Sequence, residues 1–281
     1  MHSVGRIDWS FAASPPPETA TARGLARSVM VDSSRGAVHL ELAAAAFAPG
    51  GWLATHVHAY EEAFRVLAGE MTIEIDGRCW RLQAGDFALL PVGTSHTVAN
   101  LGTEEARWIA VNTPQRFGPD DERRDTYFDV SRFDLERLRA SAVRPEADDP
   151  TVHLAGRGST SSGAAGSGIV GRPLVDRAFG ADLLTMLAVE SGAGGAEKPR
   201  DHPFEEAYVI LEGTVEAQLD GTSYELHPGD TVFAGVRTLH AFRNAGSGTA
   251  RWIMAQAPQP PLRHASRFPH LWEAFAAADP R

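Results

Sequence analysis

Three histidines and one glutamate in the first half of the chain have a spacing that could hold a metal ion. His56 and His58 are two residues apart, Glu62 follows shortly, and His96 comes directly after the turn sequence PVGTS. Residues two apart on a strand point to the same face, so both of the first imidazoles can face one site. Three imidazoles and a carboxylate suit a divalent first-row ion and leave two octahedral positions for substrate, water or dioxygen. We therefore predict that these four side chains bind metal and that Glu62 can also accept a proton.

The same pattern returns later in the chain. Residues 56–115 and 200–259 align without a gap at an offset of 144 residues, with 22 identities in 60 pairs. A repeat of this length indicates a duplicated domain, because solenoid periods are much shorter. A second candidate site follows at His202, Glu206 and His240.

The second copy differs from the first at positions that matter for chemistry. Arg200 stands where the first copy has its first histidine, and Arg237 stands where it has a glycine before the last histidine. A guanidinium cannot lose its proton to become a ligand. Its fixed charge is also unfavourable beside a divalent cation in a low-dielectric interior.

Two interpretations of Arg200 follow. In the first, Arg200 forms an ion pair with Glu205 or Glu206 and replaces the ion. In the second, the three remaining ligands hold an ion, and Arg200, with Arg237, contacts an anionic substrate. Because buried charges need partners, we favour the first and do not expect a second ion in the C-terminal copy.

Within each copy, short runs of alternating polarity end at Gly, Asp or Pro, as in EMTIEIDG and RCWRLQAG. Turns at such short, regular intervals are typical of an antiparallel sandwich or barrel. The Asp-Gly pairs at 76–77 and 220–221 favour tight hairpin turns. The sequence predicts an all-β protein with two barrels in tandem.

The arrangement of these residues resembles the two signature motifs of the cupin superfamily. The motifs read G51-x4-H56-V-H58-x3-E62-x6-G69 and G85-x5-P91-x-G93-x2-H96-x3-N100, with five residues before the first histidine if Gly50 is counted instead of Gly51. The resemblance covers residues 30–118 and 170–262 and is similar to that of two-domain cupins, or bicupins. It implies two jelly-roll barrels, with the N-terminal barrel holding the ion at His56, His58, Glu62 and His96.

On this basis we expect a division of the chain into five parts, all-β except for short helices in the linker and at the C-terminus. The parts are an N-terminal arm (1–30), an N-terminal cupin barrel (31–118), a linker (119–169), a C-terminal cupin barrel (170–262) and a helical tail (263–281). In the linker, DVSRFDLERLRAS could form a short helix capped by its serine, and GRGSTSSGAAGSG is too polar to pack and predicts a loop.

The resemblance also implies a set of functions. Bicupins and their relatives include dioxygenases, oxalate-degrading enzymes, isomerases and aminohydrolases such as ureidoglycine aminohydrolase, whose metal lies in the C-terminal barrel. We favour a metal-dependent oxidoreductase of the dioxygenase type that acts on a small oxygen-bearing substrate. Fe(II) or Mn(II) is the preferred ion, and Zn, Ni or Co would also fit. A ligand-binding or sensor module without catalysis is the alternative.

Composition narrows the partners. The net charge of −10 and the pI near 5.5 argue against nucleic acid or an anionic membrane as the binding partner, because both bind most strongly to clustered Lys and Arg. Cys79 is the only cysteine, so the chain cannot form an internal disulfide, and a reducing compartment suits it. The first residues do not resemble a signal peptide, and no apolar run is long enough to span a bilayer. We expect a cytoplasmic protein with a small-molecule substrate, and barrel edges could support a homo-oligomer.

Overall fold

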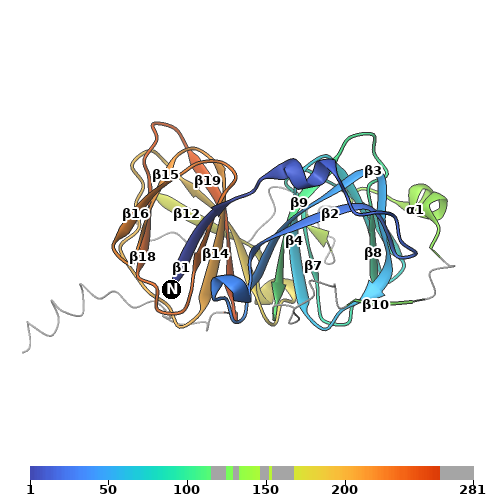
Figure 1. Cartoon of the computed structure of the whole chain (residues 1–281), viewed down its shortest axis with the longest axis horizontal. Coiled ribbons are helices and arrows are strands. Elements are labelled where there is room, and N and C mark those ends of the chain that lie inside the picture. Colours follow the sequence, from blue (N-terminus) through green and yellow to red (C-terminus); the bar gives the residue numbers. More distant parts are fainter. Residues whose placement is uncertain (115–124, 129–132, 146–151, 154–167, 260–281) are drawn as a thin grey trace, which may run out of the picture.

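The chain folds into two β-rich lobes that lie side by side (Figure 1). The structure is a computed structural model, and it describes residues 1–114, 125–128, 133–145, 152–153 and 168–259. The first lobe contains the N-terminal copy of the repeat and the second lobe contains the C-terminal copy. The all-β prediction is confirmed, because strands make up nearly all of the regular structure.

The elements follow the chain in this order. The N-terminal half contains β1 (His2–Arg6), the 3-10 helix η1 (Trp9–Ala13), β2 (Ala22–Val31), the 3-10 helix η2 (Ser33–Arg35), β3 (Glu41–Val57), β4 (Glu61–Ala68), β5 (Glu70–Ile75), β6 (Arg78–Gln83), β7 (Phe87–Leu90), β8 (His96–Ala99) and β9 (Ala106–Thr113). The linker contains β10 (Thr126–Tyr127), α1 (Leu135–Ser141) and β11 (Val152–His153). The C-terminal half contains β12 (Ile169–Val175), the 3-10 helix η4 (Arg177–Phe179), β13 (Thr185–Ser191), β14 (Glu205–Glu212), β15 (Val215–Leu219), β16 (Thr222–Leu226), β17 (Asp230–Ala234), β18 (His240–Asn244) and β19 (Ala250–Ala257).

The long strand β3 closes the N-terminal barrel. Its first part pairs with β9, from Glu41 to Phe47, and its last part pairs with β8 as far as His56. One strand of 17 residues therefore belongs to both walls of the barrel, and the strands form a single sheet. This continuity places His56 on the end of a strand that is held on both sides.

The C-terminal barrel has the same plan with a break in the corresponding strand. β13 ends at Ser191, and the following segment contains Pro199 and Pro203, which cannot donate a backbone hydrogen bond to a ladder. The barrel is therefore assigned as a six-stranded and a three-stranded sheet. An isolated bridge between Arg200 and His240 remains, at the place where the first barrel pairs His56 with His96.

The two predicted hairpin turns are confirmed. Asp76 and Gly77 join β5 to β6 with φ values of 48° and 82°, and Asp220 and Gly221 join β15 to β16 with φ values of 49° and 86°. Both central residues of each turn are left-handed, as the tight two-residue turn between twisted strands requires. The sequence and the backbone agree in both copies.

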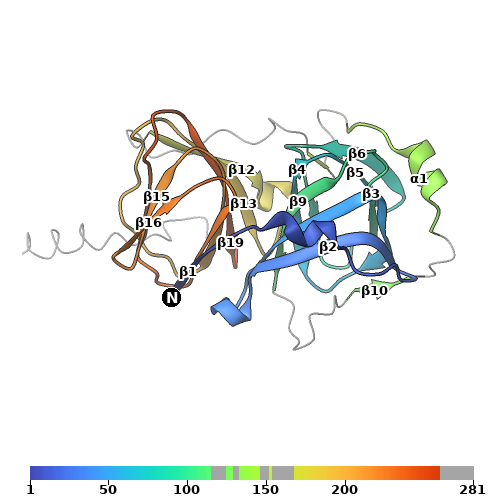
Figure 2. The same cartoon turned by 45° about the horizontal axis from the view of Figure 1, so that its top comes forward.

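The N-terminal arm contributes strands to both barrels. β1 pairs antiparallel with β17 of the C-terminal barrel, and β2 pairs with β3 of the N-terminal barrel. Figure 2 shows the start of the chain at the C-terminal lobe and β2 at the other lobe. Residues 1–30 thus tie the lobes together, while the boundaries of the two barrels stay a prediction.

The two barrels share an apolar core and a pair of reciprocal carboxylate contacts. The shared core includes Leu40 from one barrel and Leu184 from the other. Glu205 accepts hydrogen bonds from the backbone N–H groups of residues 38–40 at 2.6, 2.9 and 3.0 Å. Glu61 accepts the equivalent bonds from residues 182–184 at 2.8, 3.1 and 3.0 Å. These two contacts are here called the carboxylate clasp. Glu205 lies 144 residues after Glu61, and residues 182–184 lie 144 residues after residues 38–40, so the two contacts are equivalent and relate the barrels by a pseudo-two-fold axis.

The linker helix forms close to its predicted place with a different cap. Asp134 accepts the hydrogen bonds of the first turn of α1, and the serine predicted as the cap, at position 131, lies outside the described residues. A carboxylate at this position also suits the positive end of the helix dipole. Leu138 of α1 packs beside the buried Cys79. The predicted loop lies outside the described residues except for Gly168, and the predicted C-terminal helix lies wholly outside them.

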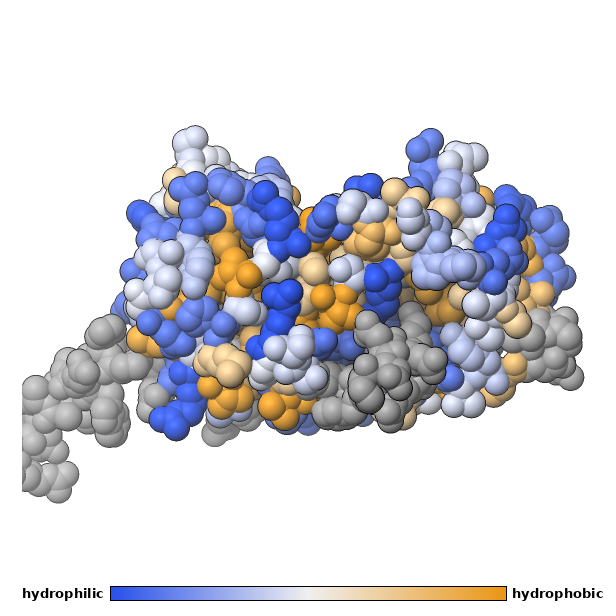
Figure 3. Space-filling view, viewed as in Figure 1, coloured by the Kyte–Doolittle hydropathy of each residue, from blue (hydrophilic) through white to orange (hydrophobic). Residues whose placement is uncertain are grey.

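The molecular surface is mostly polar on the face shown in Figure 3, and hydrophobic residues gather near the junction of the two lobes. In the part of the chain that the structure describes, no helix has the length and apolar character needed to cross a bilayer.

Candidate metal centre

The three predicted histidines of the N-terminal barrel meet at one point. His56 lies near the end of β3, His58 follows that strand, and His96 begins β8. One ring nitrogen from each lies within 4.8 Å of the others, and all three residues are buried. The pairing of β3 with β8 positions His56 opposite His96, while the alternation along the chain brings His58 to the same face.

Each of these imidazoles is oriented by its own backbone. Every Nδ1 donates to a carbonyl oxygen two residues away at 2.6 to 2.9 Å: Ala54 for His56, Tyr60 for His58 and Thr94 for His96. This bond fixes the tautomer that leaves the lone pair on Nε2. The Nε2 atom of His58 is buried and has no hydrogen-bond partner. A metal ion would satisfy such an atom, so the residues present fit the ion that the motif implies.

Glu62 lies beside this group but is not part of it. It is the second residue of β4, and its Oε2 lies 3.6 Å from Nε2 of His58. Among the described residues, the set of potential ligand atoms within 4.8 Å of one another contains the three histidines and not Glu62. The role of Glu62 as the fourth ligand therefore stays a prediction.

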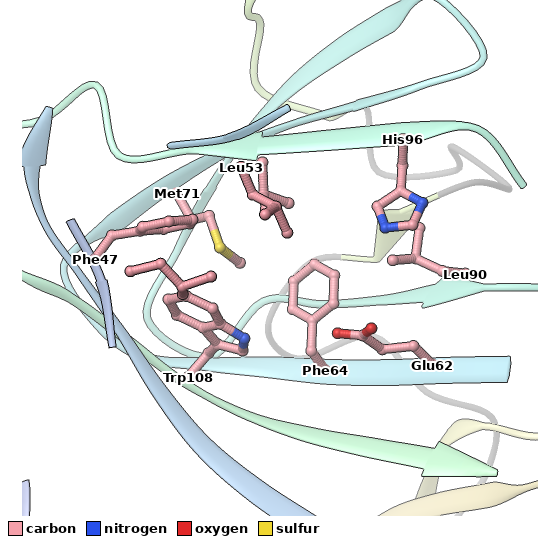
Figure 4. Close-up of a pocket in the computed structure, with 10 residues that line it drawn as sticks. Phe47, Leu53, Glu62, Phe64, Met71, Leu90, His96 and Trp108 are labelled. Atoms are coloured by element: carbon pink, nitrogen blue, oxygen red, sulfur yellow. The ribbon is translucent and has the colours of Figure 1, made fainter. Parts of the chain in front are cut away.

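An apolar cavity leads away from the site into the barrel. Figure 4 shows His96 and Glu62 facing each other at one end, with Phe64 beside them and Phe47, Leu53, Met71 and Trp108 at the other end. Its volume is about 20 Å³, room for a water-sized molecule.

A linker residue that the sequence did not single out also reaches the site. The side chain of Asp125 is fully buried, and its Oδ2 lies 3.7 Å from Nε2 of His56. Tyr60 donates to Asp125 Oδ1 at 2.9 Å, and Tyr127 donates to Oδ2 at 3.3 Å. Asp125 lies outside the repeated segment, so comparison of the two copies could not have found it.

The C-terminal barrel brings together His202, Glu206 and His240, all buried, with one atom of each within 4.8 Å of the others. Arg200 lies among them. Its Nε donates to Nε2 of His202 at 3.2 Å, which is the atom that would face an ion, and its Nη1 pairs with Glu197 at 2.6 Å. The expected ion pair of Arg200 with Glu205 or Glu206 is wrong, because Glu197 from the broken strand takes that place.

Hydrogen-bond donors surround Glu206 in the C-terminal site. Tyr208 donates to its Oε2 at 2.6 Å, Gln256 donates to its Oε1 at 2.7 Å, and Nε2 of His240 lies 2.9 Å from Oε2. Burial alone would raise the pKa of Glu206, but His240, His202 and Arg200 hold it well below its usual range. Burial likewise would lower the pKa of Arg200, but Glu197 and Glu206 keep it above its usual value. Charged and neutral donors therefore already satisfy the C-terminal carboxylate.

The N-terminal site lacks these donors. Phe64 occupies the position of Tyr208, and Asn112 occupies that of Gln256. Asn112 donates to Glu41 instead. Glu62 is left more available to an ion than Glu206 is. This difference was visible in the aligned copies as a phenylalanine opposite a tyrosine.

The side chain of Arg237 is not among those that form the C-terminal group of His202, Glu206 and His240. Arg237 is exposed on the turn before His240, with a φ of 66° at the place where the first copy has Gly93 at 77°. Its backbone N–H bonds to the carbonyl of His202, as that of Gly93 bonds to His58. The turn keeps its left-handed form without glycine, and a role of Arg237 in binding an anion stays a prediction.

Two tandem barrels, with three converging histidines in one of them, define a two-domain cupin with a candidate metal site. The family model described as "Cupin domain" matches residues 44–112 and 185–255, one match in each barrel. The chain belongs to the cupin superfamily and is a bicupin.

Known proteins are similar to this chain at low identity. A polyketide synthase, CurC of Streptomyces cyaneus, is 30% identical over 84 residues, which cover 30% of this chain and 54% of that protein. The match thus spans about half the length of the curated relative. Oxalate decarboxylase of Lactobacillus farciminis, in a formate complex, is 14% identical with a TM-score of 0.65, covering 96% of this chain and 91% of the other. Salicylate 1,2-dioxygenase of Pseudaminobacter salicylatoxidans is 15% identical with a TM-score of 0.67, covering 98% and 86%. These structures share the two-barrel fold.

Restoring the missing histidine should create a second metal site. In Arg200→His, the third imidazole returns opposite His240 and the fixed positive charge beside His202 disappears. We expect the bound metal to rise from about one to about two equivalents per chain. Elemental analysis of the purified proteins measures this.

Arg237→Gly is the matched control, because it restores another motif residue and keeps the backbone N–H that bonds to His202. Its metal content should stay that of the wild type. A count that stays at one in Arg200→His would show that Tyr208 and Gln256, not the arginine alone, exclude the ion. Two equivalents in the wild type would contradict the view that Arg200 replaces an ion.

Proposed function

We propose that the protein is a metal-dependent oxidoreductase of the dioxygenase type, working at the N-terminal barrel on a small oxygen-bearing substrate. The convergence of three buried imidazoles, each with Nδ1 held by a backbone carbonyl, supports this most directly. His56, His58 and His96 would hold one divalent ion, Fe(II) or Mn(II) by preference, with Glu62 as a further ligand. The C-terminal barrel would serve as a scaffold.

The chain's own residues have separable tasks in this proposal. The three Nε2 atoms bind and orient the ion, and a bound ion would supply Lewis acidity toward a substrate oxygen and a route for dioxygen. Glu62 can hold a proton at its carboxylate beside His58. Phe64 and the apolar wall behind it contact the carbon skeleton and keep bulk water out.

The comparisons suggest a range of substrates. The names of the structural neighbours include an oxalate decarboxylase and a salicylate 1,2-dioxygenase, and the sequence relative is called a polyketide synthase. Carboxylates, phenols and diketones therefore belong in a first panel, with ureides added for the aminohydrolase alternative. Because the cavity is small, larger compounds require movement of its side chains.

Dioxygen dependence tests the proposed chemistry. Protein loaded with Fe(II) or Mn(II) should consume dioxygen when the correct substrate is added, and its turnover should stop in an anaerobic chamber. An oxygen electrode with product analysis measures both. Equal turnover with and without air would identify a hydrolase or isomerase instead. A metal-loaded protein that binds a panel compound and leaves it unchanged would support a sensor.

The proposed setting is a reducing cytoplasm, with a small molecule and no macromolecule as the partner of the site. Cys79 is a buried free thiol whose Sγ lies 3.4 Å from Glu74. Burial raises the pKa of this thiol, which lowers its reactivity. A free thiol of this kind is compatible with a reducing compartment.

A further inference from the structure

A buried carboxylate from outside the barrel lies beside the N-terminal histidines. We propose that Asp125 is a ligand of the N-terminal metal ion, delivered by the linker segment 125–128. This inference rests on the proposed function, because it requires that the histidines hold an ion. The cupin motif does not include this residue.

The distance from Asp125 to one histidine of the triad fits a shared ion. Two donor atoms each about 2.1 Å from one ion lie about 3 to 4 Å apart unless they are on opposite sides. Asp125 Oδ2 lies 3.7 Å from Nε2 of His56, and Glu62 Oε2 lies 3.6 Å from Nε2 of His58. The two carboxylates thus have similar distances, one to each of the first two histidines, and both lie outside the set of atoms within 4.8 Å that the three imidazoles form.

The surroundings hold Asp125 in this place. Strand β10 pairs with the end of β3, Tyr127 opposite His56, and Phe128 N–H bonds to the carbonyl of Thr55 at 3.2 Å. The ring of Tyr60 stacks on His58 with centroids 3.9 Å apart, and the ring of Tyr127 lies 5.4 Å from that of His56. Both tyrosines donate their hydroxyl protons to Asp125. Each tyrosine therefore contacts one candidate ligand and orients another.

Charge supports the same conclusion. The side chain of Asp125 is 0% exposed and that of Glu62 is 10% exposed, so two carboxylates are withdrawn from water beside three imidazoles. Burying a carboxylate is costly unless a cation or several donors compensate. Two tyrosine hydroxyls are among the groups that compensate Asp125, and a divalent ion at the convergence of the imidazoles would add to them. Asp125 lies outside the repeated segment 56–115, so the alignment of the two copies gives it no counterpart.

Metal titration of the full-length, metal-free protein tests the proposal without an activity assay. Asp125→Asn keeps the size of the side chain and an oxygen for the tyrosine hydroxyls. We expect it to weaken Mn(II) binding by about 10 to 100-fold or more, and to change the visible absorption spectrum of the Co(II) form. Asp134→Asn is the matched control, because it removes an exposed linker carboxylate that caps α1 and keeps a good helix cap. It should bind both ions like the wild type.

The outcomes separate this proposal from the proposed function. Asp125→Asn with wild-type Mn(II) affinity and an unchanged Co(II) spectrum would overturn the role of Asp125 alone. Wild-type protein that binds neither Mn(II), Fe(II) nor Co(II) would overturn the proposed function and this inference with it. If Asp125→Asn does not fold, Tyr127→Phe replaces it, since this change keeps the ring on His56 and removes one donor from Asp125. A several-fold weaker affinity supports the proposal, and unchanged affinity contradicts it.

Discussion

His58→Ala protein is expected to lose the metal ion that the wild type binds. His58 supplies one of three converging Nε2 atoms, and that atom is buried without a hydrogen-bond partner. With two imidazoles left, the site no longer surrounds the ion, and we expect the affinity to fall by more than about 100-fold. Elemental analysis and Mn(II) titration measure the loss. Turnover of any substrate should disappear with the metal.

The equivalent change in the other barrel provides the control. His202→Ala removes the residue 144 positions later, at the same place in the fold. Because Arg200 already donates to His202, we expect the metal content to stay near one equivalent per chain. Retention of metal by His58→Ala together with loss by His202→Ala would reverse the assignment of the two barrels.

Glu61→Ala and Glu205→Ala are expected to destabilise the whole molecule. Each side chain is 1% exposed and accepts three backbone N–H groups from the opposite barrel. Truncation leaves those donors buried without acceptors, which should cost about 3 to 5 kcal/mol in the free energy of unfolding. Glu61→Gln keeps one acceptor oxygen and should lose about 1 to 2 kcal/mol. Urea denaturation followed by circular dichroism measures both.

Glu190→Ala serves as the control for charge alone. Its carboxylate pairs with Arg251 on the surface, where the side chains are 59% and 47% exposed. Ion pairs of this kind contribute about 0 to 1 kcal/mol. If Glu61→Ala lost no more than this control, the carboxylate clasp would have no special role in holding the barrels together.

The parts of the site that follow from short sequence patterns were predictable. The two-residue spacing of His56 and His58 predicted that both side chains lie on one face of a strand. The turn PVGTS before His96 predicted that the chain re-enters the barrel there, and the three histidines do meet. The Asp-Gly turns obey a local conformational rule, so their geometry could be inferred without the fold.

The missed residues depend on contacts between distant segments. Glu197 pairs with Arg200 because the broken strand folds back along β18, and no residue in the motif indicates this. Asp125 enters from a linker that has no counterpart in the other copy. Glu61 and Glu205 were identical at the fixed offset, but their acceptor role appears only when the barrels are packed together. The residue types showed which side chains could form ion pairs or hydrogen bonds, but the partner of each one depends on the packing of distant segments.

The carboxylate clasp has the form of a contact between identical subunits. Glu61 binds residues 182–184 as Glu205 binds residues 38–40, and this reciprocity is what an isologous dimer interface produces. If a tandem duplication fused two such subunits, both contacts of the carboxylate clasp would still be needed to hold the two barrels together. Only one of the two barrels would need to keep its full set of candidate metal ligands. The exchange of a histidine for Arg200 is then a change that a homodimer could not tolerate and a fused chain could.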